Sequence, residues 1–143
     1  MAATGEDIVD ILASLSLFSD LSRHELEAVA HTMEEEWFAE GQRIVRQGFS
    51  GTGFYLILDG EATVRRNNKK VATLGEGASF GELALLTRLP RNATVEANTD
   101  MELLILGQRE FSGLLDEVPG MAHKLLSAMA QRLSEADAKS TSS

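Results

Sequence analysis

The sequence predicts a mainly β protein, an antiparallel barrel or jelly roll with helices at both ends of the chain. Three observations support this fold class. Apolar residues near both ends recur at spacings of three and four, which is typical of amphipathic helices. Between residues 34 and 106 the apolar runs become short, and glycine- or asparagine-rich turn signals separate them. The predicted order is therefore helices, about eight strands, then helices, and no internal repeat is visible.

Composition narrows the class of protein. The 143 residues are enough for one domain with a single core, and 43% of them are hydrophobic. The absence of cysteine excludes disulfides, thiolate metal sites and cysteine nucleophiles. No apolar run approaches the ~18 residues of a membrane span, and no signal peptide is visible at the first residues. We therefore expect a cytoplasmic protein that does not enter a membrane.

The first predicted region is helical and covers residues 5–33. Its first helix carries one apolar stripe, made of Ile8, Ile11, Leu12, Leu15 and Phe18. Ser22 followed three residues later by Glu25 is a capping-box pattern, which predicts the start of a second helix. The apolar residues of this second helix are Leu26, Val29, Ala30 and Met33.

The predicted β region covers residues 34–106. Seven runs have strand character, at residues 36–39, 43–46, 53–58, 62–65, 70–74, 93–97 and 102–106. We expect the acidic run Glu34–Glu36 at the solvated start of a strand, and Trp37 and the methionines in the core or in helix packing. The basic cluster at residues 65–70 encloses Asn67 and Asn68, which predicts a solvated hairpin tip and not a nucleic-acid site. The net charge of −9 also disfavours phosphate-backbone binding.

The C-terminal region returns to helix over residues 108–138. Pro119 interrupts the pattern, because proline suits the first turn of a helix and not its interior. The second of these helices, predicted over 120–136, carries a stripe of five apolar residues: Ala122, Leu125, Leu126, Met129 and Leu133. Residues 140–143 are small and polar and are predicted to be a disordered tail or the start of a linker.

The stretch FGELALLTRLPRNATV, residues 80–95, contains the strongest candidate site. Glu82 falls on the first turn of a predicted short helix, and Arg91 follows nine residues later. A helix N-terminus favours an anion, and Gly81 lets the backbone come close to it because glycine has no Cβ. The amides of Leu83 and Ala84 and the Arg91 guanidinium would then bind one phosphate.

Glu82 does not suit the phosphate, since two anions repel each other. A carboxylate only accepts hydrogen bonds, so its expected partner is a hydroxyl donor such as a ribose 2′-hydroxyl. A ligand with a phosphate beside a free sugar hydroxyl would satisfy both residues. A 3′,5′-cyclic nucleotide has both groups on one rigid ring system.

This stretch resembles the phosphate-binding cassette of cyclic nucleotide-binding domains, with every signature position present. Residues 46–60 are similar to that family's glycine-bounded strand pair, and residues 17–21 resemble its N-terminal helical motif. One departure is Thr52, where the family often has aspartate; we expect it to affect only a turn. The resemblance implies an eight-stranded, jelly-roll-like β-roll with flanking helices, in a single domain over residues 1–139.

The resemblance also implies which residues bind. Glu82 would hold the ribose 2′-hydroxyl and Arg91 the cyclic phosphate. The full set implied for the ligand is Phe80, Gly81, Glu82, Leu83, Ala84, Arg91, Asn92 and Ala93. The candidates for contact with the base, or for a lid over it, are Val71, Arg132 and Leu133. Asn92 does not decide between bases, and cAMP is favoured over cGMP because nothing else indicates guanine.

The expected function is a regulatory domain without catalytic activity, cofactor or metal. By the resemblance, ligand binding orders residues 80–91, and the C-terminal helices move to cover the base. Helix 120–136 would pass this change to an effector domain or to a second copy of the chain. One alternative is the sensor part of a longer transcription factor, kinase or channel. A cupin-type metal enzyme is a weaker alternative, because His24, His31 and His123 fall on predicted helices.

Overall fold

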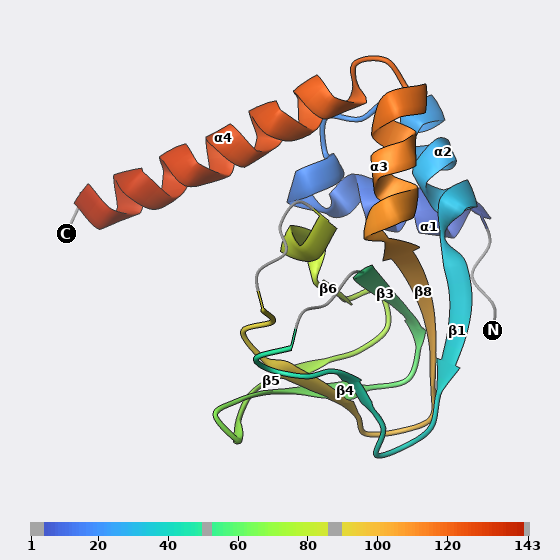
Figure 1. The fold of residues 1–143 in the computed structure, drawn as a ribbon, viewed down its shortest axis with the longest axis vertical. Coiled ribbons are helices and arrows are strands. Elements are labelled where there is room, and N and C mark those ends of the chain that lie inside the picture. The colour runs from blue at the N-terminus through green and yellow to red at the C-terminus, as the bar shows by residue number, and fades with distance from the viewer. Residues whose placement is uncertain (1–4, 50–52, 86–89, 142–143) are drawn as a thin grey trace. The chain divides into compact units, whose positions relative to one another are not determined.

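The computed structural model describes residues 5–49, 53–85 and 90–141, and Figure 1 shows its elements. The chain divides into two compact units. A β unit contains residues 32–111, and a helical unit is built from residues 3–31 and 112–143. The single domain expected over residues 1–139 stays a prediction, and each unit is described below by itself.

The β unit contains eight described strands in two four-stranded antiparallel sheets (Figure 1). The first sheet has the order β1-β8-β3-β6 and the second the order β2-β7-β4-β5. The strands are β1 Glu34–Phe38, β2 Arg43–Val45, β3 Gly53–Asp59, β4 Ala62–Arg66, β5 Lys69–Leu74, β6 Ser79–Phe80, β7 Thr94–Ala97 and β8 Met101–Gly107. The predicted β-roll with flanking helices is therefore confirmed.

The core of the β unit is formed by side chains of both sheets. Side chains alternate along each strand, so that one set faces the core and the other faces away from it. β3 and β8 occupy the middle of the first sheet and pair from Gly53 opposite Gly107 to Asp59 opposite Glu102. The buried apolar residues of one core cluster come from both sheets: Val45, Ile57, Ala62, Val95, Ala97, Met101 and Leu103. This double layer gives the loops at its ends a rigid support.

Two strands differ from the sequence prediction. β6 has only two residues, too few to show any periodicity, and it forms because Phe80 and Ser79 pair with Tyr55 and Leu56 of β3. β1 starts at Glu34, two residues earlier than predicted, so the acidic run lies inside the strand. Trp37 is 69% exposed, and its predicted place in the core or in helix packing is wrong. β1 pairs with β8 at the end of its sheet, and its residues 34–37 are all exposed.

The hairpin between β4 and β5 has the predicted tip. Asn67 and Asn68 both adopt positive φ, 54° and 65°, as a two-residue turn of type I′ requires. Asparagine tolerates this region better than most residues. Both residues are exposed, so the expectation of a solvated tip is confirmed.

The helices at the two chain ends are α1 Gly5–Ser14, the 3-10 turn η1 Ser16–Phe18, α2 Arg23–Thr32, α3 Gln108–Glu117 and α4 Met121–Thr141. The predicted capping box forms at the start of α2. The Ser22 backbone N–H donates to Glu25 Oε1 at 2.8 Å, and the Glu25 N–H donates to Ser22 Oγ at 3.2 Å. α3 ends before Pro119, as predicted. No helix in the described ranges is long and apolar enough to cross a membrane.

The buried face of α4 differs from the predicted stripe. Met121, Leu125 and Ala128 are buried, whereas Leu126 and Leu133 are 69% and 65% exposed. The face of α4 that is buried therefore differs from the predicted stripe. The stripe contained two adjacent leucines, Leu125 and Leu126, and only Leu125 is buried. α4 also continues to Thr141. Residues 140 and 141 are thus helical and not part of a disordered tail, and residues 142–143 lie outside the described residues.

Candidate functional site

The described parts of the candidate stretch form two short segments of the β unit. Phe80 ends β6, Gly81 follows with φ 84°, and Glu82–Leu85 form the 3-10 turn η2. The Ala84 N–H donates to the Gly81 carbonyl at 3.0 Å, which closes this turn. The predicted short helix with Glu82 on its first turn is confirmed, as a 3-10 turn. Residues 86–89 lie outside the described residues, and the chain continues through Arg91 into β7.

Arg91 lies against the start of β3 and beside Gly81. Its Nη2 donates to the Gly53 carbonyl at 2.5 Å. A Cβ at Gly81 would collide with Arg91 Nη1 and would come within 2.8 Å of the Gly53 carbonyl oxygen. Glycine is therefore required at position 81 both by its positive φ and by the space that the guanidinium occupies.

The charge of Arg91 is only partly compensated. Its side chain is half-buried, and its Nε is a buried donor without a hydrogen-bond partner in the described ranges. Among the described residues, no carboxylate forms an ion pair with it. Burial lowers the pKa of the guanidinium, and the nearby Tyr55 opposes this effect. Arginine stays protonated at neutral pH, so a buried cation here favours an anionic ligand.

Backbone hydrogen bonds fix the position of Arg91 from both sides. Its N–H donates to the Phe49 carbonyl at 2.9 Å, and its carbonyl accepts from the Gly48 N–H at 2.8 Å. The Gln47 N–H donates to Thr94 Oγ1 at 2.9 Å. The segment before β3 therefore holds the end of the candidate stretch in a defined register.

The tip of the β4–β5 hairpin is attached to the same segment. The Gln47 side-chain amide donates to Asn67 Oδ1 at 2.9 Å, and its oxygen accepts from the Asn67 N–H at 2.8 Å. Arg66 Nε donates to the Asn92 carbonyl at 3.3 Å. Sequence reasoning missed Gln47 and Asn67 as supports of the site, and only the turn signal of Asn67 marked that position.

The remaining predicted site residues lie as follows. Glu82 is half-buried on η2, next to the glycine that contacts Arg91. Ala84 and Ala93 are buried, and Asn92 is exposed. Val71 is 51% exposed on β5. Leu83 lies on η2, with its side chain outside the description.

Two predicted lid residues belong to the other unit. Leu133 and Arg132 lie on α4, and the side chain of Arg132 is not described. Their contact with a base stays a prediction. Conversely, the structure brings Gly53 and Tyr55 of β3 to Arg91, and the sequence analysis named neither as a site residue. A single tyrosine in an otherwise apolar strand was the available signal.

An antiparallel β-roll with a half-buried arginine beside a close-packed glycine is the arrangement expected of a domain that binds a small anionic ligand. Residues 35–118, more than half of the chain, match the sequence model of the family described as cyclic nucleotide-binding domain. The chain belongs to this family, as its resemblance in sequence predicted, and it is a cyclic nucleotide-binding regulatory domain.

Similar proteins include kinase regulators and a kinase. The chain is 41% identical over 110 residues to a cAMP-dependent protein kinase regulatory subunit of Eremothecium gossypii, covering 76% of this chain and 24% of that protein. It is 37% identical over 116 residues to a cGMP-dependent protein kinase of Plasmodium berghei, covering 79% of this chain and 14% of that protein. The chain thus spans about a quarter or less of these relatives.

Solved structures show the same fold. The N-terminal domain of a transcriptional regulator from Streptomyces coelicolor A3(2) has a TM-score of 0.82 and 30% identity, covering 89% of this chain and 94% of that one. The cAMP-bound structure of PfPKA-R has a TM-score of 0.66 and 28% identity, covering 93% of this chain and 47% of that one.

Proposed function

We propose that this domain is a sensor of cAMP in which Arg91 binds the cyclic phosphate and Glu82 accepts the ribose 2′-hydroxyl. The observation that carries the proposal is the state of Arg91: half-buried, without a carboxylate partner among the described residues, and with a buried Nε that bonds to nothing. A phosphate at this guanidinium would supply the missing anion. Glu82 is two residues from Phe80 and directly follows Gly81, so it lies at the same end of the roll.

The remaining predicted residues are proposed to contact either the phosphate or the base of the ligand. The backbone amides of Gly81, Leu83 and Ala93 complete the phosphate contacts, with Phe80 and Asn92 beside them. The Ala84 N–H, also predicted as a phosphate contact, already donates to the Gly81 carbonyl. Val71 of β5 and Arg132 and Leu133 of α4 are the proposed contacts of the base. The exposed apolar side chain of Val71 supports this role, because a purine face needs an apolar surface to stack on.

The preference for cAMP over cGMP rests on the relatives, since the exposed Asn92 does not decide between the two bases. The regulatory subunit from Eremothecium gossypii is named for cAMP, and PfPKA-R was solved with cAMP bound. The relative from Plasmodium berghei is named for cGMP. cGMP is therefore the second candidate ligand, and direct competition between the two nucleotides ranks them.

The proposed output is regulation without catalysis. Cyclic nucleotide binding would change the population of two arrangements of the C-terminal helices, which requires that the nucleotide bind one of them more tightly. α4 would carry this change to an effector domain or to a second copy of the chain. We expect the domain itself to bind neither nucleic acid nor a membrane. The lack of cysteine in all 143 residues fits action in the reducing cytoplasm.

A second candidate is the sensor domain of a transcriptional regulator. The solved domain from Streptomyces coelicolor favours it, because this chain matches 94% of that domain. The ligand site would be the same, and only the effector would differ. Sequencing the gene beyond residue 143 distinguishes a regulator with a helix-turn-helix from a kinase regulator.

Thermal unfolding tests the ligand assignment. A ligand that binds only the folded state adds about 2.7 kcal/mol to the free energy of unfolding at ~100 times its Kd. We expect cAMP to raise the melting temperature, cGMP to raise it equally or less, and 5′-AMP to have little effect. Incubation with cAMP should leave the nucleotide chemically intact. An unchanged melting temperature with every cyclic nucleotide would refute the proposal.

Glu82→Gln tests the hydroxyl assignment separately. An amide oxygen still accepts a hydrogen bond, so cAMP binding should weaken less than in a variant without Arg91. The difference in affinity between cAMP and 2′-deoxy-cAMP should become smaller. If the ratio of the two dissociation constants stays at the parent value, Glu82 does not bind the 2′-hydroxyl.

A further inference from the structure

Tyr55 lies where the two ends of the binding stretch meet β3. It is directly opposite Phe80 in the antiparallel register of β3 and β6. The two rings are stacked, with centroids 4.9 Å apart and planes inclined by 9°. β6 consists of Ser79 and Phe80 alone, so this pair makes up much of the attachment of the segment that leads into Gly81.

The same tyrosine faces Arg91. Arg91 Cζ lies over the Tyr55 ring, 5.9 Å from its centroid, within the range of a cation–π interaction. Gly53, two residues earlier on β3, accepts the hydrogen bond from Nη2. One strand thus supplies both a carbonyl and a ring to the guanidinium, while the open side of Gly81 leaves room for Nη1.

Both of these partners are electrically neutral. Burial raises the pKa of the Tyr55 phenol, with Arg91 opposing and Glu36 adding to the rise, so the phenol is uncharged at neutral pH. A carboxylate in this place would hold Arg91 equally well but would cancel its charge. A carbonyl and a ring fix the orientation and leave the positive charge for a ligand.

We propose that Tyr55 is a positioning residue for ligand binding: its ring, held in place by stacking on Phe80, orients the Arg91 guanidinium toward the phosphate. This inference rests on the proposed function, because it assumes that Arg91 binds the phosphate. It extends that function to a residue whose contact with the ligand is indirect.

The test compares Tyr55→Leu with Tyr55→Phe by calorimetric titration with cAMP, using the full chain. Tyr55→Leu should weaken binding about threefold to tenfold, the range of a partly buried cation–π contact. Tyr55→Phe keeps the ring and should retain most of the affinity. Trp37→Leu removes an exposed aromatic side chain from β1 and should leave the affinity unchanged.

Two readouts separate positioning from a general loss of structure. In an Arg91→Ala background, Tyr55→Leu should cause no further loss, because the residue that it orients is absent. The ratio of the affinities for cAMP and 2′-deoxy-cAMP should also stay at the parent value, since Glu82 is untouched. An equal loss in both backgrounds would overturn the inference.

A further series keeps the test decisive if Tyr55→Leu does not fold. Phenylalanine with increasing fluorine substitution at position 55 keeps the ring shape but makes its face less negative. Binding should weaken stepwise, by about twofold to threefold in total. A constant affinity across the series would overturn the cation–π contact.

The outcomes also separate this inference from the proposed function. If Arg91→Ala loses affinity and the Tyr55 variants do not, the phosphate site stands and the positioning role is wrong. If Arg91→Ala binds cAMP as the parent does, the phosphate assignment itself is wrong, and the role of Tyr55 fails with it.

Discussion

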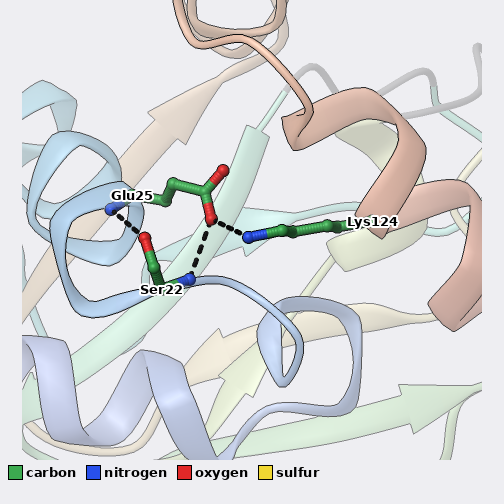
Figure 2. Close-up of polar contacts among 3 residues, drawn as sticks. All are labelled: Ser22, Glu25 and Lys124. Atoms are coloured by element: carbon green, nitrogen blue, oxygen red, sulfur yellow. Dashed lines mark hydrogen bonds and ion pairs between the residues drawn. The ribbon is translucent and has the colours of Figure 1, made fainter.

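Lys124 of the helical unit and Arg91 of the β unit are both partly buried cations, but they have opposite surroundings. Lys124 Nζ lies 2.5 Å from Oε1 of Glu25, a carboxylate that is almost fully buried and also accepts from the Ser22 N–H (Figure 2). Among the residues that the structure describes, Arg91 contacts a carbonyl and a ring, and its Nε has no hydrogen-bond partner. A cation with its own carboxylate supports the fold, whereas a cation held by neutral groups can receive an anion.

The largest effect is expected at Arg91. Arg91→Ala removes a charge-assisted contact to a partly desolvated phosphate, worth about 1.5–3 kcal/mol, so cAMP affinity should fall about tenfold to a hundredfold. The free energy of unfolding without ligand should change by less than about 1 kcal/mol, because Arg91 forms no ion pair with a described carboxylate that its removal would leave unpaired. Calorimetric titration and urea unfolding measure the two quantities.

Arg43→Ala is the matched control for this comparison. Arg43 is an exposed arginine on β2, and its removal should change neither the affinity nor the stability. If Arg91→Ala instead lowers the stability strongly and leaves the affinity intact, the two cations do not differ in the proposed way.

Lys124→Met should lower the stability and leave the cAMP affinity unchanged, the reverse of Arg91→Ala. It leaves the Glu25 carboxylate buried without its cation, and the free energy of unfolding should fall by about 1–2 kcal/mol. This is below the loss for a fully buried pair because the Lys124 side chain is 38% exposed. Urea unfolding checks it, with Lys69→Met on the solvated hairpin as the control. Adding Glu25→Gln should recover part of the loss, and a further loss would argue against the pair.

A smaller effect concerns pH. The hydrogen bond from Lys124, followed by that from the Ser22 backbone, lowers the pKa of Glu25 below its ordinary value of 4.5. Since the folded-state pKa is the lower one, Glu25 contributes stability above pH 4.5 that is lost as pH falls through the folded pKa. Parent and Glu25→Gln should therefore differ most in unfolding free energy at pH 6, and the difference should shrink as the pH falls below 4.5. A constant difference across this range would contradict the linkage.

The smallest effect is expected from the support around Arg91. Gln47→Ala removes the two hydrogen bonds to Asn67, which are exposed and therefore of modest value. We expect cAMP affinity to fall by about threefold or less, with the melting temperature nearly unchanged. Asn68→Ala, at the neighbouring turn position, changes the hairpin without touching Gln47. If it lowers the affinity by more than Gln47→Ala, the turn and not the amide pair is the support.

Features set by neighbours in sequence were predictable. The Ser22–Glu25 capping box and the Asn67–Asn68 turn each depend on a few consecutive residues, and both formed as expected. Glu82 and Arg91 were also recognisable, since the family motif keeps glycine, acid, proline and arginine in one short stretch.

Features set by partners distant in sequence were not predictable. β6 forms by pairing its two residues with β3, and Tyr55 and Arg91, far apart in the sequence, meet only in the folded β unit. The exposure of Trp37 follows from the place of β1 at the end of a sheet. On α4, two adjacent leucines made two faces equally apolar, and the sequence did not indicate which of them packs.

The acidic run on β1 has a consequence for how the protein behaves at high concentration. In the part of the chain that the structure describes, β1 pairs only with β8, so one side of its backbone is a sheet edge. An unpaired edge can template aggregation by accepting the same strand from another molecule. Glu34, Glu35 and Glu36 are all exposed there. Two such edges would bring six carboxylates together, and this repulsion disfavours fibrous assembly through β1.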